Sequence, residues 1–124
     1  MIIRGVVETG VGDFGKWIAK LSPHYRRKTG LALYPGTLNV RLPNAFDLPD
    51  NRIRLEADEY GGTVSANIVP CTILGRHAVI LRTDANDAGM GRHPREVVEV
   101  ATDVCLREIH DLHDGDMVSI EIDD

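Results

Sequence analysis

The fold of this chain depends on one stretch, residues 34–40, which reads Tyr34-Pro35-Gly36-Thr37-Leu38-Asn39-Val40. Proline presets a turn dihedral and glycine tolerates a positive φ, so the start of the stretch predicts a turn. Polar and apolar residues then alternate through residue 42, which predicts a β-strand. The apolar face of this strand should point into a core, and the Thr37 hydroxyl and the Asn39 carboxamide should share the opposite face.

These two polar side chains offer neutral oxygen atoms about 7 Å apart along a strand. Mg²⁺ takes oxygen ligands and usually keeps several waters and substrate phosphates. Thr37 and Asn39 are therefore candidate magnesium ligands, provided that phosphates supply most of the negative charge. The alternative is that they are only the solvent-exposed face of an edge strand, and the spacing by itself favours this alternative.

Size and composition limit the possible functions. A length of 124 residues predicts a single domain, residues 1–124, and contents of 43% hydrophobic and 27% charged residues are typical of a soluble globular protein. The sequence contains no apolar run of transmembrane length and no signal peptide, so we expect a cytoplasmic protein without a membrane partner. A net charge of −5 argues against non-specific nucleic-acid binding. We expect a monomer.

A glycine-rich segment, residues 10–15, follows the first predicted strand, residues 2–7. Its spacing matches the dinucleotide fingerprint GxGxxG, but no acidic residue occurs between Phe14 and Ala45, so this assignment is set aside. It also matches seven of the eight P-loop positions, with Trp17 where a Ser or Thr should bind Mg²⁺. A phosphate-binding loop of another kind and a tight structural turn remain as alternatives.

Residues 22–30 have the residue types that typically begin and end a short helix. Ser22 is a candidate N-cap, proline follows it at the first helical position, and Gly30 suits the C-terminal end. The basic run Arg26-Arg27-Lys28 would then lie at the negative end of the helix dipole. Its alternative role is a positive rim for phosphates.

Short strands joined by tight turns make up most of the remaining sequence. The predicted strands cover residues 53–55, 63–74 with a bend near Pro70, 77–82 after a Gly75-Arg76 turn, 97–100 and 117–122. A short helix is expected at 104–110, and the polar segment 83–94 has the length of a substrate lid. This order predicts an antiparallel all-β domain or barrel with short helices.

Glu99 is a carboxylate within an apolar strand, Val97-Val98-Glu99-Val100. The default expectation is that it faces water. If it points into a cleft instead, it could accept hydrogen bonds from a polyhydroxyl substrate.

Several of these segments, taken in order, resemble one family, the archaeal-type CTP-dependent riboflavin kinases. The resemblance covers nearly the whole chain. Its segments are the glycine loop 10–15, the stretch from Lys28 to Val40 with its PGTLNV core, and three C-terminal segments at 97–100, 104–108 and 112–116. It implies a compact six-stranded cradle-loop β-barrel, related to the RIFT barrels. It also implies Mg²⁺-dependent transfer of the γ-phosphoryl group of CTP to the ribityl terminal hydroxyl of riboflavin, giving FMN and CDP.

The resemblance also implies roles for individual residues. Mg²⁺ would be bound by Thr37 and Asn39, and the flavin substrate would contact Glu99 and the position of Gly91. The nucleotide would be bound by Gly10, Val11, Gly12, Asp13, Phe14, Gly15, Val104, Cys105, Leu106 and Arg107. No general base is evident, and Asp13 and Glu99 are candidates only.

Two features depart from the family pattern. Counted back from Glu99 without gaps, Gly91 falls where the family usually carries a flavin-binding threonine. The glycine loop is one residue longer at Asp13-Phe14, and segment 83–94 is extended. These departures lie near the acceptor and the phosphates, so two alternatives stay open: a CTP-dependent kinase of another small alcohol or polyol, and a non-catalytic ligand- or DNA-binding barrel.

Overall fold

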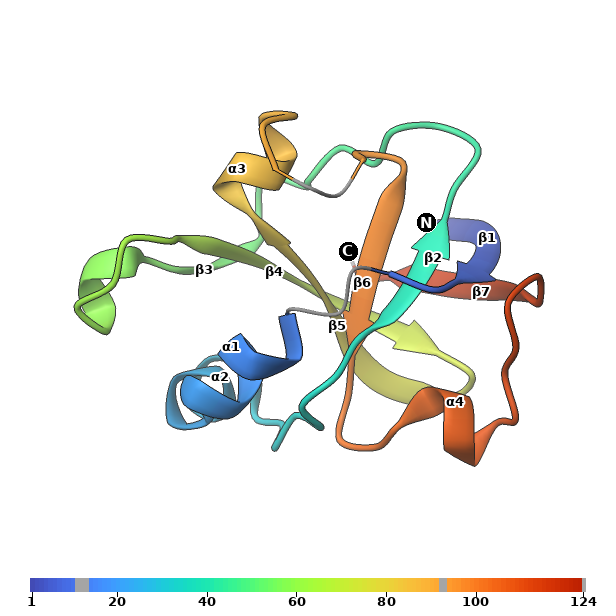
Figure 1. Ribbon diagram of the computed structural model, residues 1–124, viewed down its shortest axis with the longest axis horizontal. Helices are drawn as coiled ribbons and strands as arrows, with labels where there is room; N and C mark the ends of the chain where they lie inside the picture. Colours follow the sequence, from blue (N-terminus) through green and yellow to red (C-terminus); the bar gives the residue numbers. More distant parts are fainter. Residues whose placement is uncertain (11–13, 92–93, 124) are drawn as a thin grey trace.

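The structure is a computed structural model that describes residues 1–10, 14–91 and 94–123. Strands dominate it, and the helices are short (Figure 1). The elements in chain order are β1 (Ile2–Glu8), α1 (Phe14–Lys20), α2 (Ser22–Thr29), β2 (Leu38–Arg41), β3 (Ile53–Leu55), the 3₁₀ turn η1 (Ala57–Glu59), β4 (Ala66–Ile73), β5 (Arg76–Thr83), α3 (Asp84–Asp87), β6 (Val97–Ala101), α4 (Leu106–Ile109) and β7 (Met117–Ile122).

Six antiparallel strands close into a barrel in the order β4-β5-β6-β2-β1-β7, and β7 pairs back with β4. The predicted all-β barrel is therefore confirmed. β3 lies outside this ring and pairs only with the first part of β4, so the two strands form an arm that projects from the barrel (Figure 1).

Strand β4 changes partners part-way along its length. Its residues 66–68 pair with β3, and its residues 71–73 pair with β7. Pro70 lies between the two pairings. At this point a residue without an N–H group costs the sheet no hydrogen bond. The bend expected near Pro70 corresponds to this change of partner.

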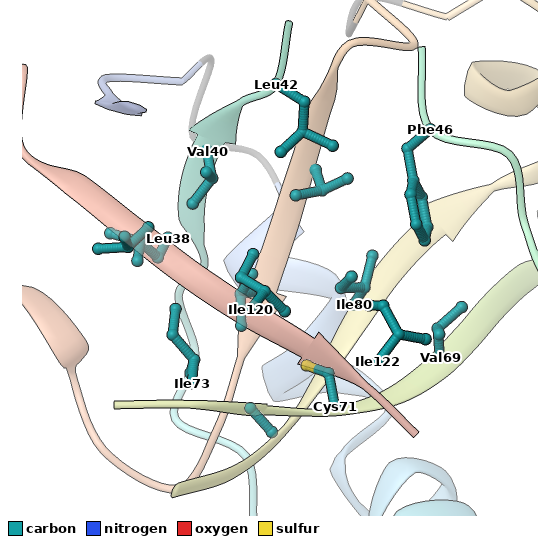
Figure 2. Packing of buried hydrophobic residues seen from close by; sticks show 14 of the residues in the cluster. Leu38, Val40, Leu42, Phe46, Val69, Cys71, Ile73, Ile80, Ile120 and Ile122 are labelled. Carbon is teal, nitrogen blue, oxygen red and sulfur yellow. The ribbon is translucent and has the colours of Figure 1, made fainter. Parts of the chain in front are cut away.

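The barrel interior is filled by the apolar faces of the strands (Figure 2). Leu38 and Val40 of β2 lie in this core, as the alternation predicted. A second apolar cluster lies outside the barrel, where Phe14 and Ile18 of α1 pack with Leu81 of β5. Helix α1 therefore covers part of the outer face of the barrel. The polar side chain of Asn39 on β2 is on this outer face and is only 6% exposed.

Several local expectations need correction. Leu21, not Ser22, occupies the N-cap of α2 and makes no side-chain capping bond, whereas Gly30 ends the helix in the left-handed conformation, as expected. Gly36 is not among the glycines with positive φ; its N–H donates to the Tyr34 carbonyl at 2.8 Å. The β4–β5 turn falls one residue earlier than expected, at Leu74-Gly75 with φ values of 50° and 75°, which is typical of a type I′ hairpin.

The arm is held to α3 by an ion pair that predicts a pH dependence. Arg54 donates to both oxygens of Asp84 at 2.9 Å, and this hydrogen bonding is the main reason that the pKa of Asp84 is lowered. A lowered folded pKa stabilises the protein above the usual aspartate value of about 3.9, and that stabilisation is lost as the pH falls through the folded value. We expect Asp84→Asn to lower stability at pH 7 and to reduce the further loss on acidification, measured by urea unfolding at pH 7 and pH 3. The exposed Asp50→Asn is the control; equal pH dependence in Asp84→Asn and the wild type would contradict the prediction.

Candidate functional site

A row of polar side chains crosses three neighbouring strands of the barrel. Asn39 of β2 is in register with Glu8 of β1 on one side and with Glu99 of β6 on the other. Residues directly opposite each other in antiparallel strands point to the same face, so the three side chains are neighbours. Asn39 is 6% exposed and Glu99 is 3% exposed. Neither side chain faces open water, so the default expectation for Glu99 is wrong.

The carboxamide of Asn39 lies against the start of the glycine segment. A Cβ added to Gly10 would lie 2.3–2.4 Å from three atoms of this side chain, so a larger residue at position 10 would displace the carboxamide. The Oδ1 atom of Asn39 is buried and accepts no hydrogen bond from the residues that the structure describes. Buried polar atoms normally have a partner, so an acceptor held in this way fits a ligand that brings positive charge.

Thr37 lies on the same face as Asn39. Its hydroxyl donates a hydrogen bond of 2.9 Å to Oε1 of Glu99. A hydroxyl has one proton and two lone pairs, so donation to the carboxylate leaves the lone pairs of Oγ1 available to a cation. The two predicted metal ligands are therefore brought to one face, and their chemistry fits Mg²⁺, which prefers oxygen ligands.

The other described end of the glycine segment contacts the Pro35-Gly36 turn. A Cβ added to Gly15 would lie 2.6 Å from the backbone oxygen of Pro35. Gly10 and Gly15 thus hold the two ends of the segment against the same stretch, residues 35–39. Val11, Gly12 and Asp13 lie outside the described residues, so their predicted roles stay predictions.

A small pocket of about 70 Å³ joins Thr37 to the predicted cytidine-binding segment. Its lining includes Tyr34, Gly36, Thr37, Leu38, Val100, Val104, Cys105, Leu106 and Arg107. The pKa of the Tyr34 hydroxyl is raised, chiefly by the neighbouring Cys105, so the phenol stays protonated at neutral pH. The segment 104–107 and one of the two predicted metal ligands, Thr37, therefore line one pocket, although Val104 follows Thr37 by 67 positions in the chain.

Arg107 fixes this segment to the end of β1. It donates to the Glu8 carbonyl at 3.0 Å and to Asp114 at 2.6 Å. Thr9 donates to the same carboxylate at 2.7 Å, and this bond, together with Arg107, holds the pKa of Asp114 below its usual range. The result is a brace between α4 and the residues that lead into the glycine segment, which sequence reasoning did not identify.

The predicted acceptor residues are placed differently. Glu99 lies in the polar row, whereas Gly91 lies beside α3, where a Cβ would meet Oδ1 of Asn86 at 1.5 Å. The segment expected to be a lid, 83–94, begins with helix α3, and Thr83 caps this helix by accepting from the Asn86 N–H at 3.1 Å. Asn86 was not identified from the sequence because no motif contains it.

Phe14 and the basic run occupy positions away from the polar row. Phe14 is 6% exposed and lines an apolar pocket of about 300 Å³ together with Trp17 and Tyr60. In the basic run, Arg27 bonds His24 at 2.9 Å and Lys28 pairs with Glu59 at 2.8 Å. The rim for phosphates that this run might form stays a prediction.

The sequence of this chain is similar to that of one family of known proteins. A family model named CTP-dep_RFKase, described as "Domain of unknown function DUF120", matches residues 7–122. Riboflavin kinases of Archaeoglobus fulgidus, Methanocorpusculum labreanum and Methanocella arvoryzae are 32%, 31% and 30% identical over 97–98% of this chain. The chain spans only 54–57% of the length of these relatives. Within the part of the chain that the structure describes, no helix has the length and apolarity needed to cross a membrane. The chain belongs to the archaeal-type CTP-dependent riboflavin kinase family.

Proposed function

We propose that this chain is a Mg²⁺-dependent kinase that transfers the γ-phosphoryl group of CTP to the ribityl terminal hydroxyl of riboflavin, giving FMN and CDP. The observation that carries the proposal is the buried Oδ1 of Asn39, which accepts no hydrogen bond from the described residues. This atom lies between the glycine segment and Glu99. Leu38, the residue before Asn39, lines the pocket that Thr37 shares with residues 104–107.

Thr37 and Asn39 would hold the magnesium ion through one hydroxyl and one carboxamide oxygen. Bound together with the triphosphate, the ion would offset the negative charge that develops during phosphoryl transfer. Two neutral ligands suit this task, because the phosphates themselves bring the charge that the ion needs. The backbone N–H groups of the glycine segment would position the phosphates, and catalysis would consist mainly of positioning and charge stabilisation.

Glu99 is the described carboxylate best placed to meet the acceptor hydroxyl. It is buried, and it already orients Thr37 through a 2.9 Å hydrogen bond. In the proposed complex, the Glu99 carboxylate accepts a hydrogen bond from the ribityl chain and holds its hydroxyl toward the γ-phosphate. Asp13 remains the second candidate for a general base.

The direct test is turnover of riboflavin with CTP and Mg²⁺, followed by separation of FMN and CDP. Isothermal titration with CTP, ATP, riboflavin and FMN, each with and without Mg²⁺, tests the two substrate sites separately. We expect CTP binding to depend on Mg²⁺ and to exceed ATP binding. No binding of any nucleotide, with no turnover, would overturn the proposal. Size-exclusion chromatography of the same sample tests the expected monomer.

A kinase of another small alcohol is the second candidate, and the glycine at position 91 favours it. This position has no side chain to offer an acceptor, and Asn86 fills the space beside it. CTP consumption that is stimulated by a non-flavin alcohol, with riboflavin inert, would support this alternative.

The two cysteines provide a test of the nucleotide pocket that does not depend on turnover. Cys71 is buried, and burial raises its pKa to about 12, whereas Cys105 is partly exposed in the pocket beside Tyr34. Because the thiolate is the reactive form, we expect only Cys105 to react with a thiol reagent in the folded protein at pH 8. Saturating CTP with Mg²⁺ should slow this reaction by about 10-fold or more, and Cys105→Ser serves as the control. An unchanged rate would contradict the predicted position of the nucleotide.

A further inference from the structure

The outer face of residues 37–41 carries a third polar side chain besides the two candidate metal ligands. The alternate residues of this stretch fill the barrel core (Figure 2), so Thr37, Asn39 and Arg41 lie together on the opposite face. Alternate residues of a strand are about 7 Å apart, so the three side chains form a line with Asn39 in the middle. The side chain of Arg41 is 47% exposed and can therefore meet a ligand.

The order of these side chains follows the proposed order of the nucleotide. Thr37 and residues 104–107 line the pocket that is proposed for the cytidine. Asn39 comes next along the strand, where its side chain lies against Gly10 at the start of the glycine segment. A CTP molecule with its base in this pocket would extend its phosphates from Thr37 past Asn39. The γ-phosphate is the last of the three, so it would come nearest to Arg41.

Strand β1 supplies a carboxylate that holds Arg41 beside the polar row. β2 lies between β1 and β6 (Figure 1), and Glu8 of β1 is directly opposite Asn39. Arg41 donates from Nε to one Glu8 carboxylate oxygen at 2.8 Å and from Nη2 to the other at 3.1 Å. A guanidinium group has five N–H donors in one plane, and Glu8 engages two of them. Arg41 can therefore bind Glu8 and a phosphate oxygen at the same time.

The charges of the polar row also favour a cation at this place. Glu8 and Glu99 put a carboxylate on each side of Asn39, and both would repel a triphosphate. Arg41 offsets the charge of Glu8 and directs N–H donors to the same face. The alternative is a surface ion pair without a role in binding, which predicts that Arg41 has no effect on the difference between CTP and CDP.

We propose that Arg41 is a catalytic residue that donates hydrogen bonds to the γ-phosphate of CTP, and that Glu8 is the positioning residue that orients it. This inference rests on the proposed function for the donor and for the direction of transfer. The acceptor hydroxyl oxygen forms a bond to the γ-phosphorus while the bond from that phosphorus to the β,γ-bridging oxygen breaks. The bridging oxygen keeps the bonding electrons and leaves on CDP, and the hydroxyl proton passes to the general base, Glu99 or Asp13. Arg41 stabilises the negative charge on the oxygens of the transferred group.

The test compares the affinities for CTP and CDP by isothermal titration with Mg²⁺ and without an acceptor, so that the γ-phosphate is the only difference. We expect Arg41→Met to weaken CTP binding by about 10-fold and to change CDP binding by less than about 2-fold. Arg41→Lys should restore part of the loss, because it keeps the charge without the planar fork. With saturating substrates, kcat of Arg41→Met should fall by at least about 10-fold.

Arg4→Met is the matched control for the loss of one positive charge. Arg4 is exposed on the outer face of β1, where it donates to Ser119 at 3.3 Å. We expect this variant to bind CTP and CDP as the wild type does. An equal weakening of CTP binding in Arg4→Met and Arg41→Met would assign the effect to overall charge and would overturn the inference.

Glu8→Gln tests the positioning role through the sign of its effect. Loss of a carboxylate near the phosphates should, by charge alone, strengthen the binding of CTP more than that of CDP, because CTP is the more negative ligand. If Glu8 orients Arg41, the variant should instead lower the ratio of CTP affinity to CDP affinity. A ratio higher than that of the wild type would remove Glu8 from this role.

The outcomes separate this inference from the proposed function. An unchanged ratio of CTP to CDP affinity in Arg41→Met, with unchanged kcat, would overturn the inference and leave the kinase intact. Equal weakening of both nucleotides would place Arg41 away from the γ-phosphate and would also overturn it. A wild type that prefers CTP over CDP through Arg41 but forms no FMN from riboflavin would support the contact and overturn the proposed acceptor.

Discussion

Asn39→Ala is expected to lower kcat/KM for riboflavin phosphorylation by about 100-fold or more, with little change in stability. The proposed role of Oδ1 is to bind the magnesium ion that accompanies CTP, and groups of this kind contribute on the order of 100-fold to activity or metal affinity. The atom has no hydrogen-bond partner among the described residues, so its removal breaks no hydrogen bond among them. The free energy of unfolding should therefore change by only about 1 kcal/mol.

The Mg²⁺ dependence distinguishes this role from a structural one. A lost ligand should raise the Mg²⁺ concentration needed for half-maximal activity, and kcat should recover in part at high Mg²⁺. Thr37→Ser keeps the hydroxyl that donates to Glu99 and should retain most activity, whereas Thr37→Val should resemble Asn39→Ala. The exposed Asn44→Ala is the matched control. A loss of activity with an unchanged Mg²⁺ requirement would remove Asn39 and Thr37 from the metal site.

The position of the Asn39 side chain also explains why residue 10 is a glycine. In Gly10→Ala, the new methyl group would meet the Asn39 side chain at 2.3–2.4 Å and would push the carboxamide away from its place. We expect this variant to lose activity in parallel with Asn39→Ala and with the same change in the Mg²⁺ requirement. A Gly10→Ala enzyme with normal activity would show that the approach of Gly10 to Asn39 is not needed.

The sequence predicted the barrel because its strands have clear periodicity and clear turns. The alternation from Thr37 to Leu42 correctly assigned the core face of β2. It therefore also placed Asn39 on the opposite face, where it lies beside Glu99. The burial of Glu99 is harder to predict from the sequence, because a single carboxylate in an apolar strand does not indicate which residue it will contact. Its burial follows from the register of β6 against β2 and β5, which is a long-range property.

The apolar pocket lined by α1, α2, the arm and α3 could not be predicted because its parts are distant in the chain. Helix α1 begins inside the segment whose glycines suggest a phosphate-binding loop, and α3 lies inside the segment that the sequence predicts to be a lid. In the sequence, Trp17 is only a mismatch to the P-loop pattern, whereas in the structure it lines this pocket. Tertiary contacts between α1, α3 and the arm create the pocket, and local sequence patterns do not predict such contacts.

Arg82 is expected to be the most important single polar residue for stability among those described. It is 3% exposed, and its guanidinium group donates to the backbone carbonyls of Phe46, Arg95 and Val97. It also lies over the Phe46 ring at 5.6 Å and pairs with Asp87 of α3 at 3.4 Å. One side chain thus joins the loop after β2, the start of β6 and α3.

We expect Arg82→Met to lower the free energy of unfolding by about 3–5 kcal/mol. Methionine fills much of the space but removes the guanidinium donor from three carbonyl groups, of which the Arg95 carbonyl still accepts from the Phe46 N–H at 3.0 Å. Each buried group that loses its partner costs about 1–3 kcal/mol. Burial lowers the pKa of Arg82, yet Asp87 and the carbonyls favour the charged form, so the residue remains a cation at neutral pH. Arg82→Lys should lose less, because it keeps the charge but cannot reach three carbonyls at once.

Arg76→Met on the same strand is the matched control. Arg76 is 36% exposed and pairs with Asp103 at 3.5 Å, so its replacement should change stability by about 0.5 kcal/mol or less. Urea unfolding of the three variants at pH 7 measures the differences. If Arg82→Met were as stable as Arg76→Met, the bonds from Arg82 would not be needed for stability, and the start of β6, two residues before Glu99, would be held without them. In the expected case, the clamp that stabilises the fold also fixes the strand that carries Glu99.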